Sequence, residues 1–118
     1  MRKVEAAAVY RLIKQHGVTI LCGAPIVLNL LANAPDSAKV KFERVIEVVT
    51  GGAAPPSAII EAMERNGFHV THLYGLTETY GPATVNEWRT GWDALPAAEQ
   101  AAKKARQGVR YVPLEALD

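Results

Sequence analysis

This chain of 118 residues has a single cysteine, Cys22, and no long hydrophobic run. One cysteine excludes an internal disulfide and a cysteine-rich zinc site, so we expect a reducing, cytoplasmic setting. The most apolar stretch, from Val18 to Leu31, is interrupted by Gly23 and Pro25 and is too short to span a bilayer. The sequence therefore predicts no transmembrane segment.

The chain also lacks an excess of charge of either sign. Its formal net charge is +1, which gives no electrostatic reason to expect binding to nucleic acid or to an anionic membrane. The basic residues are scattered, apart from the run Lys103-Lys104-Ala105-Arg106. We interpret this run as the solvated face of a helix rather than as a binding patch.

Familiar catalytic and phosphate-binding motifs are missing too. The sequence has no GxxxxGKS/T phosphate loop, no GxGxxG motif and no Ser/His/Asp set that suggests a nucleophile. His69 and His72 fall on an expected strand at positions of opposite parity, so they point to opposite faces and cannot share a metal ion. His72 would share the face of Tyr74 and could touch a ligand, but a histidine hydrogen-bonded within the sheet is the simpler interpretation.

What is present is an alternation of helical and strand patterns. Apolar residues recur at helical spacing over 5–16, 26–32 and 57–66, and short β-rich runs, the first expected to be buried, cover 18–22, 44–49 and 68–73. This alternation predicts parallel strands joined by right-handed crossovers. With 49% hydrophobic residues, the composition suits one α/β domain with a modest core.

The pattern changes after Gly81-Pro82. Residues 83–86 favour a further short strand, 87–95 look irregular, and 96–106 form an alanine-rich helical pattern that offers little apolar surface. We therefore divide the chain into a core α/β unit over about 4–86 and a surface excursion over about 87–118.

The two most informative segments each follow a strand. Tyr74-Gly75-Leu76-Thr77-Glu78-Thr79 follows the run 68–73, and Thr50-Gly51-Gly52-Ala53 follows the run 44–49. Because ligands of open α/β sheets bind at the carboxyl ends of the strands, we expect the two segments to line one crevice.

The side chains of the first segment suit a magnesium nucleotide. The Tyr74 ring can stack on a flat base, and Gly75 lets a ligand approach the backbone. Thr77 and Thr79 offer hydroxyl groups to phosphate oxygens, and Glu78 offers a hard oxygen ligand to Mg²⁺. No positive charge accompanies them. On residue types alone, plain turns in both segments are the alternative.

Taken together, Thr50–Ala53 and Tyr74–Glu78 resemble the paired motifs of the adenylate-forming (AMP-binding) superfamily. The stretches 18–35 and 88–111 are similar to its branch of fatty and medium-chain acyl-CoA synthetases. The resemblance covers essentially the whole chain. It implies part of a parallel sheet flanked by helices, within the large N-terminal domain of such an enzyme, so that residues 1–118 are a single, partial AMP-binding domain.

The resemblance also implies roles for individual residues. Tyr74 stacks on adenine, Thr77 contacts the α-phosphate, and Glu78 holds Mg²⁺. Gly51, Gly52 and Ala53 form the rim around the base and part of the wall of the acyl pocket. Gly75 and Gly81 lie beside the acyl group. Thr77 and Glu78 are thus the expected catalytic residues, and Gly75 also belongs to the nucleotide-binding set.

The implied reaction uses ATP, Mg²⁺, a carboxylic acid and coenzyme A. The carboxylate attacks the α-phosphate of ATP to give an acyl-adenylate and pyrophosphate, and the coenzyme A thiol then takes the acyl group and releases AMP. Positioning and electrostatic stabilisation would carry most of the first step.

Three parts of that family's site are not found in these 118 residues. They are the Ser/Thr/Gly-rich phosphate loop ending in Pro-Lys-Gly, the later Thr-Gly-Asp segment, and the C-terminal domain with its catalytic lysine. We therefore expect an internal piece of a synthetase that is inactive alone. Two other hypotheses stay open: a non-catalytic nucleotide-binding or interaction module that folds with a partner, and a bare α/β fragment that self-associates through exposed sheet edges.

Overall fold

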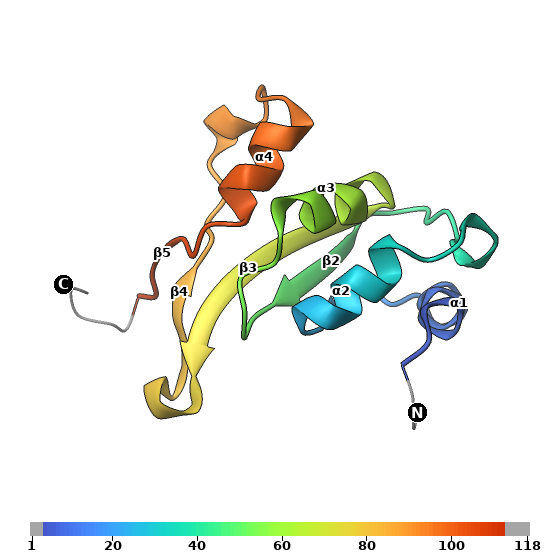
Figure 1. Cartoon of the computed structure of the whole chain (residues 1–118), viewed down its shortest axis with the longest axis horizontal. Coiled ribbons are helices and arrows are strands. Elements are labelled where there is room, and N and C mark those ends of the chain that lie inside the picture. The colour runs from blue at the N-terminus through green and yellow to red at the C-terminus, as the bar shows by residue number, and fades with distance from the viewer. Residues whose placement is uncertain (1–3, 113–118) are drawn as a thin grey trace.

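The computed structural model describes residues 4–112, which form a five-stranded mixed sheet with helices packed on it (Figure 1). The strands follow the order β1 (Ile20–Cys22), β2 (Ile46–Thr50), β3 (Phe68–Leu76), β4 (Gly81–Val85) and β5 (Val109–Arg110). The α-helices are α1 (Ala6–His16), α2 (Pro25–Ala32), α3 (Ser57–Arg65) and α4 (Ala97–Lys104). Short 3-10 helices, η1 (Asp36–Ala38), η2 (Thr77–Thr79) and η3 (Thr90–Trp92), lie in the connections.

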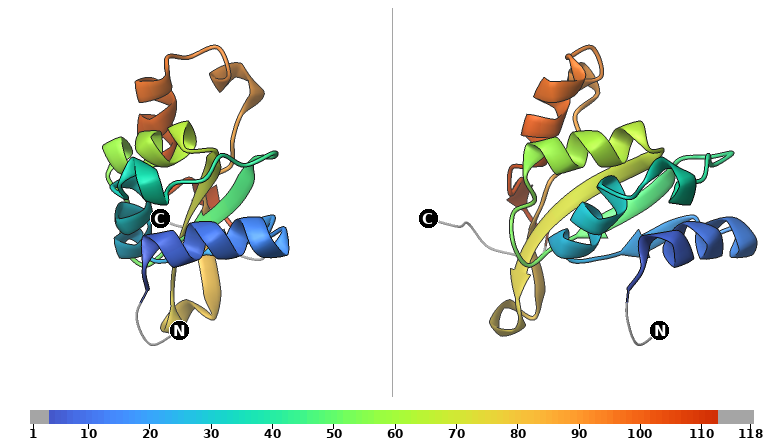
Figure 2. Two further views of the ribbon diagram at one scale, coloured as in Figure 1. Left: turned by 90° about the vertical axis from the view of Figure 1, so that its right-hand side faces the viewer. Right: turned by 45° about the vertical axis from the view of Figure 1, so that its right-hand side comes forward.

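The first half of the sheet confirms the α/β prediction. β1, β2 and β3 are parallel, with α2 connecting the first pair and α3 the second. Val48 and Val70, paired on β2 and β3, are buried with Ile60 of α3 in one core, whereas Glu47 is exposed. Since successive side chains of a strand alternate between faces, one face of the sheet carries the core under α2 and α3 (Figure 2).

Tyr10 joins α1 to this core. Its side chain is fully buried, and its hydroxyl donates to the Leu31 carbonyl of α2 at 3.2 Å. The centroid of its ring lies 5.8 Å from that of Phe42 and 5.8 Å from that of Phe68, the first residue of β3. Burial raises the pKa of the Tyr10 phenol, which keeps the hydroxyl protonated as a donor.

The second half of the sheet is antiparallel. β4 pairs with β3 from Leu73 opposite Val85 to Leu76 opposite Gly81, and β5 pairs with β4. The expected strand at 83–86 is therefore present as β4, but the expectation that β3 ends at Leu73 was wrong. The strand continues to Leu76 because β4 supplies hydrogen-bonding partners, and no local sequence pattern predicts this pairing.

Two apolar segments carry strongly exposed residues. β1 was expected to be buried, but it is an edge strand in which Ile20 is 58% exposed. On α2, Leu28 and Leu31 face the core while Ile26 is 73% exposed. Over residues 4–112, the chain contains no helix with both the length and the apolar character needed to cross a membrane.

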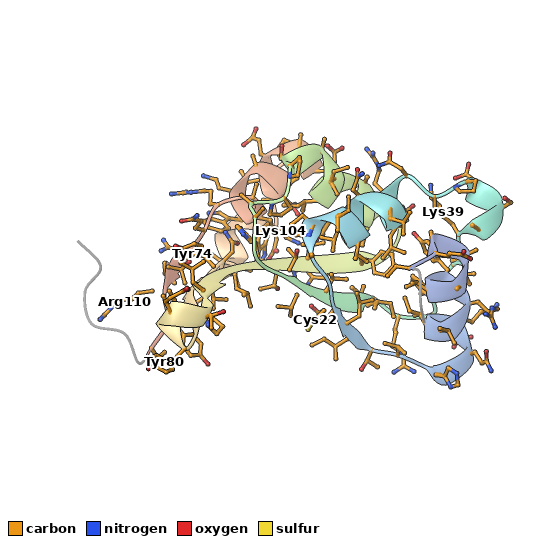
Figure 3. All side chains as sticks on the ribbon, turned by 60° about the horizontal axis from the view of Figure 1, so that its bottom comes forward. Cys22, Lys39, Tyr74, Tyr80, Lys104 and Arg110 are labelled. Carbon is orange, nitrogen blue, oxygen red and sulfur yellow. The ribbon has the colours of Figure 1, made fainter. Side chains whose placement is uncertain are left out.

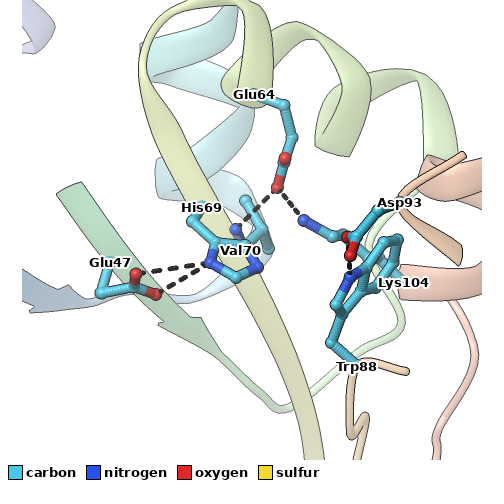
Figure 4. Close-up of polar contacts among 7 residues, drawn as sticks. All are labelled: Glu47, Glu64, His69, Val70, Trp88, Asp93 and Lys104. Atoms are coloured by element: carbon cyan, nitrogen blue, oxygen red, sulfur yellow. Dashed lines mark hydrogen bonds and ion pairs between the residues drawn. The ribbon is translucent and has the colours of Figure 1, made fainter. Parts of the chain in front are cut away.

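The last third of the described chain packs on α3 through an ion pair whose lysine is buried (Figure 4). Lys104 of α4 is only 4% exposed, and its Nζ lies 2.6 Å from Oε1 of Glu64 on α3 and 4.8 Å from the centre of the Trp88 ring. The same Glu64 oxygen accepts the Val70 N–H at 2.9 Å, where β3 has no β4 partner. The expectation of a solvated basic face was thus wrong for Lys104, because its partner lies 40 positions away.

Polar side chains of β3 and β4 fix the chain just after α4. His72 Nδ1 donates to the Arg106 carbonyl at 3.1 Å, and Thr84 Oγ1 donates to the Gln107 carbonyl at 2.7 Å. Asn86, directly after β4, donates to the Lys103 carbonyl at 2.8 Å. These bonds satisfy carbonyl groups at the end of a helix, and they hold the 87–110 segment against the strand that carries Tyr74.

We predict that Glu64→Ala destabilises the chain strongly, by about 3 kcal/mol, because it leaves the buried Lys104 ammonium and the Val70 N–H without a partner. Glu61→Ala is the matched control: Glu61 is about as exposed as Glu64, but its partner at 2.8 Å, Arg65, has a side chain that is 67% exposed, so its loss should cost about 0.5 kcal/mol. Urea unfolding followed by tryptophan fluorescence measures both. Replacing Lys104 with Met in the Glu64→Ala background should restore part of the stability; equal losses at Glu61 and Glu64 would contradict the role of the buried pair.

Candidate functional site

The two segments identified in the sequence lie against each other at the carboxyl ends of β2 and β3. Thr50, the last residue of β2, pairs with His72 of β3. A Cβ atom added at Gly51 would lie 2.9 Å from Leu73 Cδ1 and 3.3 Å from the Leu73 carbonyl oxygen. The glycine loop therefore packs closely against the residue that precedes Tyr74, and a side chain at position 51 would have to displace the end of the Leu73 side chain.

Tyr74 lies within β3 and not in the loop that follows, so the strand fixes its backbone. It sits opposite Thr84 of β4, and its side chain is half-buried. Among the described residues, its ring contacts no other aromatic ring and its hydroxyl has no hydrogen-bond partner. Figure 3 shows Tyr74 on the β3–β4 hairpin, whose tip projects beyond the end of β2 in Figure 1. A ring held in this way is suited to stacking on a flat ligand.

Gly75 allows β3 and β4 to approach each other closely. The pairing of the two strands shifts register between Tyr74 and Gly75, so the hairpin contains an irregularity at this point. A Cβ at Gly75 would collide with the Gly81 carbonyl oxygen and would lie 2.9 Å from Pro82 Cα. The close packing of β4 is thus sufficient to explain why position 75 is a glycine.

Thr79 fastens the turn at the tip of the hairpin. Its Oγ1 accepts the Leu76 N–H at 2.9 Å, and its hydroxyl hydrogen reaches the Gly81 carbonyl at 2.7 Å. The expectation that Thr79 offers its hydroxyl to a phosphate is therefore wrong, because the turn already uses that group. The turn is therefore fixed, and the two residues that precede Thr79 lie at its tip.

Those two residues, Thr77 and Glu78, are exposed at the tip. No other residue of 4–112 forms a hydrogen bond or an ion pair with the Glu78 carboxylate. The same part of the chain holds no cluster of three or more histidine, cysteine or acidic side chains for a metal. One carboxylate and a neighbouring hydroxyl fit Mg²⁺, which usually takes one or two protein carboxylates and completes its shell with phosphate oxygens and water.

Tyr80 completes the turn in a strained conformation. Its φ of 56° makes it the one non-glycine residue with a positive φ among residues 4–112, and its side chain is fully exposed. The left-handed conformation costs an L-residue roughly 1–2 kcal/mol, and Gly or Asn ordinarily occupies it. Sequence reasoning missed this residue, because φ at a turn depends on how the two strands are paired.

The histidines of β3 are structural. His72 is buried and donates to the Arg106 carbonyl, as the sheet interpretation predicted, and His69 lies on the other face with its Nδ1 3.3 Å from Glu47 Oε2. Beside His72, the Thr50 hydroxyl is buried and has no hydrogen-bond partner among the described residues. The sequence pointed to Thr50 only as the start of a glycine loop.

The comparisons with known proteins agree with each other. The profile of the AMP-binding enzyme family matches residues 1–115. An acetate–CoA ligase from Humulus lupulus is 50% identical over 119 aligned residues, covering 100% of this chain and 21% of that protein. A peroxisomal acetate/butyrate–CoA ligase from Arabidopsis thaliana is 47% identical with the same coverage of both chains.

Solved structures give the same picture of the fold. The N-terminal domain of FACL13 from Mycobacterium tuberculosis superposes with a TM-score of 0.65 at 27% identity, covering 85% of this chain and 24% of that one. This chain therefore spans about a fifth of the length of the curated relatives that it matches.

We predict that Gly75→Ala destabilises the chain by about 2 kcal/mol, because the new methyl group meets backbone atoms of β4 that cannot move aside without breaking the pairing. Gly91→Ala is the matched control, since a Cβ at Gly91 has no atom within 4 Å. Thermal unfolding by circular dichroism compares the two variants. Equal melting temperatures would show that the close approach at Gly75 is not a constraint.

Proposed function

This chain belongs to the family of AMP-binding enzymes, and from that premise we propose that it supplies the adenine and magnesium side of an AMP-forming acyl-CoA synthetase site. The observation that carries the proposal is the arrangement at the strand ends. The Gly51 loop packs beside Tyr74, and the turn held by Thr79 presents Thr77 and Glu78 to solvent with no partner in the described chain.

The nucleotide would lie between the glycine loop and the hairpin. Tyr74 would stack on adenine, an interaction worth about 1–3 kcal/mol per base in other proteins. The backbone of half-buried Gly51 and of the exposed residues Gly52 and Ala53 would line the edge of the base. Gly75, on the strand between Tyr74 and the turn, would contribute through the close approach of β4 that it permits, which places the turn beside Tyr74.

The turn would hold the reacting phosphate. The Thr77 hydroxyl would donate to an α-phosphate oxygen, and the Glu78 carboxylate would hold Mg²⁺. When bound, the ion would neutralise charge on the phosphate oxygens as the carboxylate of the acid attacks. The turn fixed by Thr79 would keep both side chains in place before the ligand arrives, which lowers the cost of ordering them.

The acid would enter on the Gly81 side of the hairpin, with Gly75 on the opposite strand. Because the two similar relatives are an acetate–CoA ligase and an acetate/butyrate–CoA ligase, we propose a short aliphatic carboxylic acid as the substrate class. Coenzyme A would then accept the acyl group from the adenylate. A cytoplasmic setting stays our prediction from the single cysteine.

We propose further that these 118 residues do not catalyse the reaction by themselves. The segments 50–53 and 74–81 contain no lysine or arginine, so nothing in them compensates the charge of a triphosphate. Pyrophosphate release would need cationic groups supplied from elsewhere in a complete enzyme.

We predict that Glu78→Ala reduces ATP–pyrophosphate exchange about 100-fold when residues 1–118 replace the matching segment of the Humulus lupulus acetate–CoA ligase. The loss reflects the missing metal ligand, and folding should be unaffected because Glu78 has no partner among the described residues. Glu99→Ala, which removes an exposed carboxylate on α4, is the control and should leave exchange unchanged. Full exchange in the Glu78→Ala chimera would remove the assigned role.

We also predict that the 118-residue chain binds ATP with Mg²⁺ weakly and that Tyr74→Ala lowers the affinity about tenfold through loss of stacking. Isothermal titration measures this, with Tyr111→Ala, at an exposed tyrosine after β5, as the control. Saturable binding that survives Tyr74→Ala would contradict the adenine role. Binding by the chain without exchange activity in the chimera would favour the non-catalytic nucleotide-binding module.

A further inference from the structure

The strain at Tyr80 has no explanation within the described chain. Its backbone N–H bonds to the Thr77 carbonyl at 3.2 Å, a contact that any residue other than proline can make. Its ring is fully exposed, so it gains nothing from packing, while its φ of 56° favours Gly or Asn instead. Strained residues cluster at active sites and ligand-binding sites, so the conformation of Tyr80 supports a contact with a ligand.

The hairpin tip around Tyr80 carries both apolar and polar residues. Leu76, at the end of β3, is 48% exposed, and Pro82 on the facing strand is also exposed. Thr77 and Glu78 carry the polar groups of the same turn. The tip therefore places an uncharged aromatic ring and other apolar groups next to the residues assigned to the phosphate and the metal ion.

We propose that the Tyr80 ring packs against the hydrocarbon part of the carboxylic acid substrate and helps to select which acids are accepted. This inference rests on the proposed function, since it uses the reacting phosphate at Thr77 and Glu78 as its reference point. A base is already assigned to Tyr74, which lies within β3, whereas Tyr80 occupies the tip of the hairpin (Figure 3). A ring without charge suits a hydrocarbon better than it suits phosphate.

The first measurement is the stability of the 118-residue chain. Tyr80→Asn places a residue that tolerates the left-handed conformation at the turn, so it should raise the melting temperature by about 3 °C. Tyr80→Phe keeps both the ring and the strain and should leave the melting temperature unchanged. A melting temperature that falls in Tyr80→Asn would show that the ring stabilises the chain itself, and it would overturn the proposal.

The second measurement is steady-state kinetics in the Humulus lupulus chimera with butyrate as the acid. Tyr80→Asn should raise the KM for butyrate about tenfold and leave the KM for ATP within about twofold, because a contact to the acid alone is lost. Tyr80→Phe should behave as the parent chimera, and Tyr111→Asn is the matched control. An equal change in both KM values, or a change in neither, overturns the proposal. A chimera that Tyr80→Asn destabilises also overturns it, because the ring would then pack against another part of the protein.

An inactive parent chimera counts against the proposed function. The role of Tyr80 is then tested by measuring binding. The 118-residue chain is then titrated with AMP and with the butyryl sulfamate analogue of the acyl-adenylate. Tyr80→Asn should weaken binding of the analogue several-fold and leave AMP binding unchanged. Binding of neither molecule overturns both proposals, and equal effects on the two molecules overturn the role of Tyr80 alone.

Discussion

β3 is the element on which the rest of this structure depends. It pairs with β2 in parallel along one edge, and the carboxyl-terminal part of its other edge pairs with β4 in the antiparallel direction. Phe68 and Val70 fill the core at one end of the strand, while Tyr74 stands at the other. One continuous strand thus joins the hydrophobic core to the candidate site, so the position of Tyr74 is set by the same packing that stabilises the fold.

The close approach of β3 and β4 sets the shape of the hairpin tip. Gly75 permits the approach, and Thr79 closes the turn by bonding to Leu76 and Gly81. Groups that satisfy each other inside the turn leave Thr77, Glu78 and Tyr80 to face outward. The backbone of the candidate site is pre-ordered, whereas the side chains of these three residues have no partners in the described chain. This suits a surface that is completed by a ligand and by protein groups from elsewhere.

The 87–110 segment packs on the face of β3 that carries His72, which by strand alternation is also the face of Tyr74. Lys104 and Glu64 join α4 to α3, and His72 and Asn86 both donate to the Arg106 carbonyl after α4. These contacts link elements far apart in the sequence, and they bury the Lys104 ammonium and His72, which lies two residues before Tyr74 on β3. An ion pair with a buried lysine contributes little net stability, since desolvation offsets much of the attraction, whereas removal of one partner leaves the buried charge uncompensated.

The sequence by itself determined the alternating helices and strands, the parallel half of the sheet and the two segments at its carboxyl edge, because hydrophobic periodicity and turn residues are local signals. It also determined that His69 and His72 point apart. Only the tertiary structure decided that β3 runs on to Leu76, that the Thr79 hydroxyl is used by the turn, that Lys104 is buried, and that Tyr80 is strained. Each of these depends on a partner brought in by strand pairing or helix packing, such as Glu64 for Lys104 or β4 for the end of β3, and no local pattern carries that information.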